Sequence, residues 1–337
     1  MDEGQWHEKF VDALTAQIAR GVSLEYAVLN LECHDWIQSV APYDLVIWQP
    51  KYMGPRSAGY FKEKVYFLER ILGKLVVPGF SSIWHFESKA AQSYLFETFG
   101  VPTPRTIVTF DYDDARACLA ASEMPMVFKK SHGASSKNVR LLNHRAEAIR
   151  TITNAFSQQA WNEVKWRHES MLQRLQASIF TPWFWVKVVQ KITGDERVGL
   201  AYWQEYVGGN EADLRITVIG DRFAYGFWRM NRANDFRASG SGRPDYQRPI
   251  PKEVLHYCLE LNRKFGFDSM AYDILFGPGG FVLTEMSYAY LDSFLYNSSG
   301  HYELTDAADL EFREGHVWPQ DLWTEWALIR ARRELDK

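Results

Sequence analysis

Residues 269–287 read SMAYDILFGPGGFVLTEMS, with two apolar runs on either side of GPGG at 277–280. Glycine and proline supply the dihedral angles of a tight turn, so the segment predicts a β-hairpin. If the last three residues of GPGG form the loop, Asp273 lies directly opposite Glu285. A loop that is one residue longer or shorter would instead separate the two carboxylates.

Residues in directly opposed positions have Cβ atoms roughly 5 Å apart, and two carboxylates placed there repel unless a cation bridges them or one of them is protonated. Oxygen donors of this kind suit Mg²⁺. The hairpin therefore indicates a candidate magnesium site, and a hairpin whose carboxylates face different ways is the structural alternative.

The composition is that of a globular protein, with 46% hydrophobic and 24% charged residues among 337. The formal net charge of −4 and a pI near 6.2 give no electrostatic signature for nucleic acid or anionic lipid. We find no run of 18 apolar residues and no secretory signal pattern, and therefore expect a cytoplasmic protein without a membrane span. The three cysteines are widely separated, which argues against a zinc site or a disulfide framework.

The first 80 residues suggest a small α/β unit. Helical spacing at residues 4–20 is followed by short apolar runs at 26–31, 44–48 and 75–77, and a helix-like stretch spans 60–72. Alternating strands and helices of this kind favour a parallel sheet.

A predicted strand at 125–130 brings Lys129 and Lys130 to the start of a polar loop, SHGASSKN at 131–138, and 139–142 looks like the return strand. A lysine next to a Gly/Ser loop can cradle phosphate, because the ammonium neutralises charge while N–H and hydroxyl groups donate to oxygens. The Walker A order of glycines, lysine and serine is missing. Surface hairpins look similar, so the loop alone does not establish a phosphate site.

Two helices are expected over 146–177, with a break near Gln158, followed by strands at 197–207, 211–221 and 222–228. The next loop, 229–242, is rich in Arg, Gly and Ser. Together with Arg215 it supplies four arginines that can bind carboxylate or phosphate oxygens. Amphipathic and charged helices are expected at 251–265 and 321–335.

Taken together, the motifs resemble the ATP-grasp superfamily, nearest to its glutathione-synthetase-like and ribosomal-peptide-ligase-like branches, over residues 82–297. The resemblance implies an α/β (α+β) ATP-grasp fold with ATP held between two subdomains. It implies an N-terminal α/β domain at 1–80, a central lid subdomain at 81–203 and a C-terminal subdomain at 204–337.

Carried over by matching motifs, the resemblance implies four sets of site residues. The metal ligands are Asp273, Glu285 and Ser287. The nucleotide ligands are Lys89, Lys129, Ser135, Ser136, Gln204, Glu205, Tyr206, Val207, Glu211 and Asp213. The substrate-binding residues are Arg229, Arg232 and Arg237. The catalytic residues are Arg215, Arg237 and Lys129. Ser287 stands where the family usually has asparagine, which leaves the number of Mg²⁺ ions open.

The resemblance implies an ATP-dependent carboxylate–amine ligase that works through an acyl phosphate and uses ATP and Mg²⁺. An amino acid, a peptide or an amino sugar would serve as substrate, and a homodimer is compatible with the family. Two alternatives stay open: an ATP-grasp kinase that phosphorylates a small molecule, and a non-catalytic ATP-binding scaffold.

Overall fold

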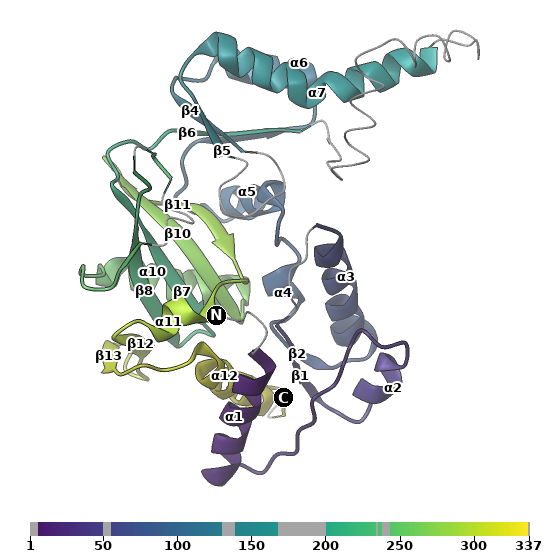
Figure 1. Ribbon diagram of the computed structural model, residues 1–337, viewed down its shortest axis with the longest axis vertical. Coiled ribbons are helices and arrows are strands. Elements are labelled where there is room, and N and C mark those ends of the chain that lie inside the picture. The colour runs from purple at the N-terminus through teal and green to yellow at the C-terminus, as the bar shows by residue number, and fades with distance from the viewer. Residues whose placement is uncertain are drawn as a thin grey trace. The chain divides into compact units, whose positions relative to one another are not determined.

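The computed structural model describes residues 6–49, 55–129, 139–167, 200–233, 235–237 and 243–335 (Figure 1). Contacts divide the chain into two compact units. The first comprises Met1–Thr103 and Val207–Lys337, and the second Pro104–Ser131 and Lys137–Tyr206. The three domains expected from the sequence, with boundaries after residues 80 and 203, stay a prediction.

An antiparallel sheet forms the centre of the first unit, in the order β11-β10-β7-β8-β12-β13, with β9 paired to β8. Its strands are β7 (Ala212–Ile219), β8 (Phe223–Met230), β9 (Pro244–Asp245), β10 (Ser269–Gly277), β11 (Gly280–Ser287), β12 (Gly300–Leu304) and β13 (Leu310–Glu314). Helices α10 (Lys252–Phe265) and α11 (Asp292–Tyr296) belong to the same unit.

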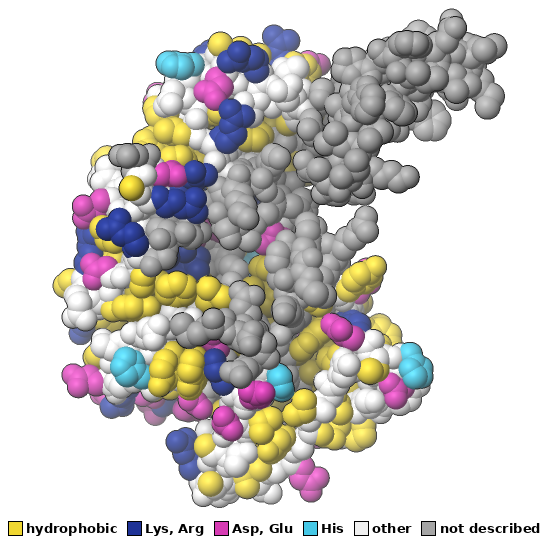
Figure 2. Space-filling model, in the orientation of Figure 1, with side chains coloured by type: hydrophobic (Ala, Val, Ile, Leu, Met, Phe, Trp, Pro, Cys, Tyr) yellow, Lys and Arg dark blue, Asp and Glu magenta, His cyan; other side chains and the backbone are white. Residues whose placement is uncertain are grey.

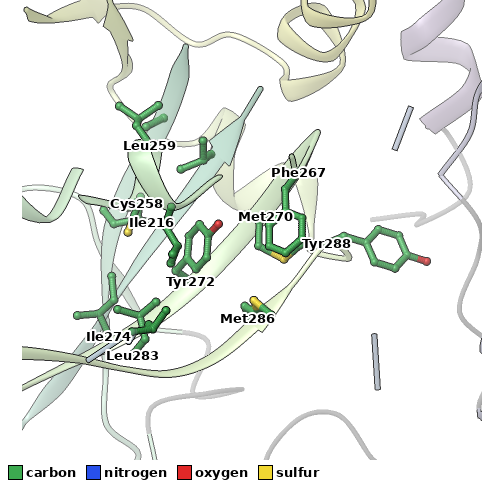
Figure 3. Close-up of a cluster of buried hydrophobic side chains, with 14 of the residues drawn as sticks. Ile216, Cys258, Leu259, Phe267, Met270, Tyr272, Ile274, Leu283, Met286 and Tyr288 are labelled. Atoms are coloured by element: carbon green, nitrogen blue, oxygen red, sulfur yellow. The ribbon is translucent and has the colours of Figure 1, made fainter. Parts of the chain in front are cut away.

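Alternating side chains give β7 and β10 one apolar and one polar face. Their apolar face packs with α10 in a buried cluster that includes Leu214. Figure 3 labels other members of this cluster, among them Ile216, Cys258, Leu259, Tyr272 and Ile274. Because neighbouring residues point to opposite faces, Asp213, Arg215 and Asp273 lie on the other side of the sheet. The fold therefore gathers charged side chains on the face away from this core.

A two-residue turn closes the hairpin between β10 and β11, so the three-residue loop predicted from the sequence is wrong. The ladder is regular as far as Ile274 opposite Leu283, and a β-bulge at Thr284 then shifts the register. Relative to the predicted pairing, the two-residue turn shifts the register by one residue, and the bulge shifts it back by one residue. Asp273 consequently lies opposite Glu285, as predicted, although the intervening pairs differ from the predicted ones.

The N-terminal segment contains α1 (Trp6–Ala19), α2 (Trp36–Val40), β1 (Leu45–Ile47), α3 (Pro55–Tyr66), the π-helical turn η1 (Phe67–Ile71), β2 (Leu75–Val77), α4 (Phe80–Ile83) and α5 (Lys89–Thr98). Strands β1 and β2 pair in parallel, as predicted. The strand predicted at 26–31 is wrong. Residues 22–30 have no regular structure and Val28 is 62% exposed, because an apolar run becomes a strand only where a neighbouring strand and a core accept it.

Asp268, at the start of the hairpin segment, links three parts of the first unit. Its buried carboxylate accepts hydrogen bonds from the Gly79 N–H at 2.6 Å, from Trp326 Nε1 at 2.9 Å and from Arg330 Nη1 at 2.7 Å. A Cβ at Gly79 would lie 2.3 Å from Glu69 Oε1, so Glu69, which accepts from the Phe80 N–H at 3.0 Å, would have to move. Trp326 and Arg330 belong to α12 (Pro319–Leu335), which also packs against α1.

The second unit has a four-stranded antiparallel sheet in the order β3-β6-β4-β5. Its elements are β3 (Thr106–Thr109), α6 (Tyr112–Ala120), β4 (Met126–Lys129), β5 (Val139–Leu142), α7 (Arg145–Arg167) and β6 (Ala201–Glu205). Helix α7 continues through Gln158, so the break predicted there is wrong. Glutamine is a good helix former, and neither glycine nor proline interrupts this stretch.

Within the described ranges, no helix has both the length and the apolar character needed to cross a membrane. On the face drawn in Figure 2, basic, acidic and hydrophobic side chains are interspersed. Such mixing fits the small net charge of the sequence.

Candidate functional site

The two acidic residues Asp273 and Glu285 lie opposite each other on β10 and β11. Leu283 and Met286 both join the core although they are three residues apart, a spacing that regular alternation does not allow. The bulge at Thr284 permits both to face the core while Glu285 faces the same side as Asp273. The bulge therefore keeps the acidic pair together on the polar face of the sheet.

Asp273 is 6% exposed and is held by two arginines, Arg215 from the adjacent strand β7 and Arg229 from β8, the strand beyond it. Arg215 Nε donates to Oδ1 at 2.8 Å and Arg215 Nη2 to Oδ2 at 2.9 Å, while Arg229 Nη2 lies 2.8 Å from Oδ2. Burial alone would raise the pKa of Asp273, but the two guanidinium groups outweigh burial and hold the pKa well below its usual value. Asp273 is therefore ionised at neutral pH.

Arg229 is shared with a second buried carboxylate, Asp213, which lies opposite it on β7. Arg229 Nε donates to Asp213 Oδ1 at 2.6 Å. Burial raises the pKa of Asp213, and Arg229 opposes this effect while also serving Asp273. Asp213, Arg215, Arg229 and Asp273, to which the resemblance assigned roles in nucleotide binding, catalysis, substrate binding and metal binding, are thus brought together in one buried ionic network.

Lys89 begins α5, where the Ser88 hydroxyl caps the helix by accepting from the Ala91 N–H at 3.3 Å. The Lys89 side chain is 9% exposed, and its Nζ donates to Glu285 Oε1 at 2.7 Å. Burial would lower the pKa of Lys89, but the attraction of Glu285, and more weakly of Glu87 and Asp273, raises it above its usual value. A permanent positive charge therefore lies beside the acidic pair.

Gln92 is a residue of this region that sequence reasoning missed. It lies one turn after Lys89 on the same face of α5 and is 5% exposed. Its Nε2 donates to Met286 O at 2.8 Å, and its Oε1 accepts from the Met286 N–H at 3.4 Å. The only signal in the sequence was the three-residue spacing from Lys89, which does not reveal a partner on a distant strand.

Ser287, expected as a metal ligand, directs its hydroxyl to the backbone of Ala289. Its Oγ donates to Ala289 O at 2.8 Å and accepts from the Ala289 N–H at 3.2 Å. These bonds use the hydroxyl hydrogen and one of its two lone pairs. One lone pair is left for any further ligand, so metal binding by Ser287 stays a prediction.

The arginine-rich loop after β8 contains its own ion pair. Arg237 Nε donates to Asp235 Oδ2 at 2.9 Å, and hydrogen bonding by Arg237 lowers the pKa of Asp235. The backbone N–H of Arg232 donates to Arg237 O at 3.1 Å, which closes the loop. Glu211 is exposed just before β7, and its Oε1 lies 3.3 Å from Arg248 Nη1.

In the second unit, Lys129 is the last residue of β4 and is 8% exposed, with its Nζ 6.0 Å from the centroid of the Tyr202 ring. Gln204 is buried and donates to Thr106 Oγ1 at 3.0 Å. Of the other expected nucleotide ligands, Glu205 ends β6, Tyr206 and Val207 follow it, and Ser135 and Ser136 lie outside the described residues.

The donors at Asp273 and Glu285 fit a hard divalent cation such as Mg²⁺. Both are carboxylates. Glu285 is 40% exposed and so can be reached by a ligand, whereas Asp273 would share its oxygens between the cation and its two arginines. In the part of the chain that the structure describes, no three His, Cys, Asp or Glu side chains are grouped to hold a metal. A cation here would therefore complete its shell with water or phosphate oxygens, as Mg²⁺ commonly does.

No protein-family model matches this chain. Over 208 residues it is 22% identical to the alpha-aminoadipate–LysW ligase LysX of Saccharolobus solfataricus, a match that covers 62% of this chain and 63% of that ligase, less than two thirds of its length.

In structure, the chain is similar to a RimK-domain ATP-grasp protein from Sphaerobacter thermophilus, with a TM-score of 0.51 and 12% identity over 96% of this chain and 95% of that one. It is also similar to the biotin carboxylase domain of a 2-oxoglutarate carboxylase from Hydrogenobacter thermophilus, solved with MgADP and bicarbonate. That TM-score is 0.52, with 15% identity over 87% of this chain and 55% of that one. The predicted mixed fold of helices and sheets is confirmed, and the fold of the chain is similar to that of ATP-grasp proteins.

Proposed function

We propose that this protein is an ATP-dependent carboxylate–amine ligase that forms an amide bond and releases ADP and phosphate. One observation carries the proposal: Asp273 lies opposite Glu285 on the polar face of an ATP-grasp sheet, and Lys89, Arg215 and Arg229 are bonded to the pair. Enzymes catalyse phosphoryl transfer mainly by positioning the reactants and neutralising charge. A cluster of ionised carboxylates and fixed cations can do both.

In this proposal Asp273 and Glu285 hold Mg²⁺, with Ser287 as an additional oxygen donor. Bound Mg²⁺ would neutralise negative charge on the phosphate oxygens. Arg215 and Arg229 keep Asp273 ionised, and Lys89 balances the charge of Glu285. The protein's own task is to hold these charges in place.

The nucleotide in this proposal is ATP. Lys89, Lys129 and the serines at 135 and 136 would bind its phosphates, and the backbone of 204–207 would pair with adenine. Because Arg229 already occupies the Asp213 carboxylate, the exposed Glu211 is the better candidate for the ribose hydroxyls.

For the chemical step, we assign Lys129 to the charge on the transferred phosphoryl group and Arg215 and Arg237 to the charge on the acyl oxygen. Arg232 and Arg237 would bind an anionic substrate, whereas Arg229 is buried between two carboxylates and acts through them. The carboxylate would take the γ-phosphoryl group of ATP, and the amine would then displace phosphate.

The substrate class is inferred from the relative, whose name describes the ligation of alpha-aminoadipate and LysW. We infer a carboxylate and an amine drawn from amino acids, peptides or amino sugars. A cytoplasmic location, where ATP and such substrates are available, is part of the proposal.

The test is consumption of MgATP by the purified protein in pools of carboxylates and amines, with ADP and free phosphate quantified separately. Equal amounts of ADP and phosphate, released only when both substrates are present, are expected. ADP without free phosphate would overturn the ligase in favour of a kinase. Nucleotide binding without consumption in any pool would overturn it in favour of a scaffold.

A further inference from the structure

Helix α5 contacts β11 at two successive residues. Lys89 binds the side chain of Glu285, and Gln92 binds the backbone of Met286, the next residue along the strand. Gln92 and Met286 are 5% and 1% exposed, so both hydrogen bonds are shielded from water. The first turn of α5 therefore binds the carboxylate of Glu285 and the backbone of Met286.

β11 is the edge strand of the sheet in the part of the chain that the structure describes, and no strand there pairs with its outer N–H and C=O groups. The Gln92 carboxamide supplies one donor and one acceptor there, as a paired strand would. On the other side of the bulge, the Leu283 N–H donates to Pro102 O at 2.8 Å. The short stretch that contains Thr284 and Glu285 is thus fixed at both ends by groups outside the sheet.

We propose that Gln92 is a positioning residue for the divalent-cation site: by holding the Met286 backbone, it orients Glu285 on one side and Ser287 on the other. This inference rests on the proposed function. Gln92 itself touches neither Asp273 nor the cation. It acts through β11, whose bulge would otherwise leave the direction of the Glu285 carboxylate poorly fixed.

Both the chemistry and the length of the side chain matter for this role. Methionine has a similar shape but neither donates nor accepts a strong hydrogen bond, and asparagine keeps the carboxamide but is one methylene shorter. Neither replacement can make both bonds to Met286. Gln320 offers a matched control, because it is fully buried and donates to Asp292 at 2.7 Å rather than to β11.

The experiment measures Mn²⁺ binding to the full-length protein by electron paramagnetic resonance, with Mn²⁺ as the probe of the cation site. The variants are Gln92→Met, Gln92→Asn, Glu285→Gln and Gln320→Leu, each checked for folding by thermal unfolding. We expect Mn²⁺ affinity to fall by about tenfold or more in both Gln92 variants, the usual effect of removing a residue that supports a ligand. Gln320→Leu should bind Mn²⁺ like the wild type.

The outcomes separate this inference from the proposed function. Mn²⁺ binding that survives Glu285→Gln unchanged would overturn the metal site and the proposed function with it. Loss of binding in Glu285→Gln together with wild-type binding in the Gln92 variants would overturn the positioning role alone. If Gln92→Met does not fold, Gln92→Asn, which keeps a polar side chain, decides.

Discussion

Asp273 and Glu285 lie opposite each other because a β-bulge at Thr284 compensates for a two-residue hairpin turn. With that turn and no bulge, Asp273 would face Thr284 and the glutamate would turn toward the core. The bulge also lets Leu283 and Met286 enter the same core. One inserted residue thus reconciles the packing of β11 with the placement of its only carboxylate.

Glu285→Gln is expected to reduce turnover of MgATP by about 100-fold or more, because a neutral amide is a poor ligand for a hard divalent cation and cannot balance Lys89. Steady-state ADP release measures this effect. Glu311→Gln, on β13 with a half-exposed side chain, should keep the wild-type rate. A near-normal rate in Glu285→Gln would contradict the site assignment.

Lys89→Met and Glu285→Gln should differ in stability. Removing Glu285 leaves a buried ammonium without its 2.7 Å partner, which we expect to lower the free energy of unfolding by about 1–3 kcal/mol. Removing Lys89 leaves a glutamate that water reaches, at a cost of about 0–1 kcal/mol. Urea denaturation of both variants tests the difference, and equal losses would argue against the buried position of Lys89.

Asp268→Asn should destabilise the first unit by about 3–5 kcal/mol, because it leaves Arg330 beside a neutral group and disturbs the bonds to Gly79 and Trp326. Asp221→Asn is the matched control. Its partners, Arg263 and Arg333, are 59% and 55% exposed, so the loss should be about 0–1 kcal/mol. Similar denaturation midpoints for the two variants would show that Asp268 does not link these segments.

His85 should make stability fall below neutral pH. It is fully buried between Trp84 and Phe267, no hydrogen-bond partner for its ring nitrogens lies in the described part of the chain, and burial lowers its pKa to about 3. Below pH 6.5 His85 binds a proton in the unfolded chain but stays neutral in the folded chain. The free energy of unfolding is therefore highest above pH 6.5 and decreases as the pH falls toward 3. By linkage this loss is about 2 kcal/mol at pH 5.

The variant that tests this is His85→Phe, which keeps an aromatic ring but cannot be protonated. Its free energy of unfolding should fall by about 2 kcal/mol less than that of the wild type between pH 7 and pH 5. Denaturation curves at the two pH values give the comparison. Parallel losses in both proteins would assign the acid sensitivity to other groups.

Lys129→Ala should abolish turnover in a folded protein, because we assign its ammonium to the charge on the transferred phosphoryl group. Lys264→Ala, which removes an exposed lysine of α10, should leave the rate unchanged. ATP turnover and circular dichroism together test the prediction. Turnover in Lys129→Ala close to the wild-type rate would remove Lys129 from the proposed machinery.

Much of the fold was predictable because local signals agreed. The hairpin, the parallel pair β1 and β2, and the order of strands and helices follow from turn residues and hydrophobic spacing. The strand predicted at 26–31 failed because no strand in the described part of the chain pairs with these residues. The break predicted at Gln158 failed for a local reason, since the stretch contains good helix formers and neither glycine nor proline. For the candidate site, the sequence predicted which residues take part but not the hydrogen bonds and ion pairs between them.

By itself, the sequence determined the hairpin and the chemical identity of the acidic pair, Asp273 and Glu285, since these depend on residues a few positions apart. Only the tertiary structure decided how the pair is held. Gln92 and Met286 are 194 residues apart in the chain, and Lys89 and Glu285 are 196 apart. Hydrogen bonds and ion pairs over such separations are set by how helices and strands pack, a relationship that spacing along one segment does not contain.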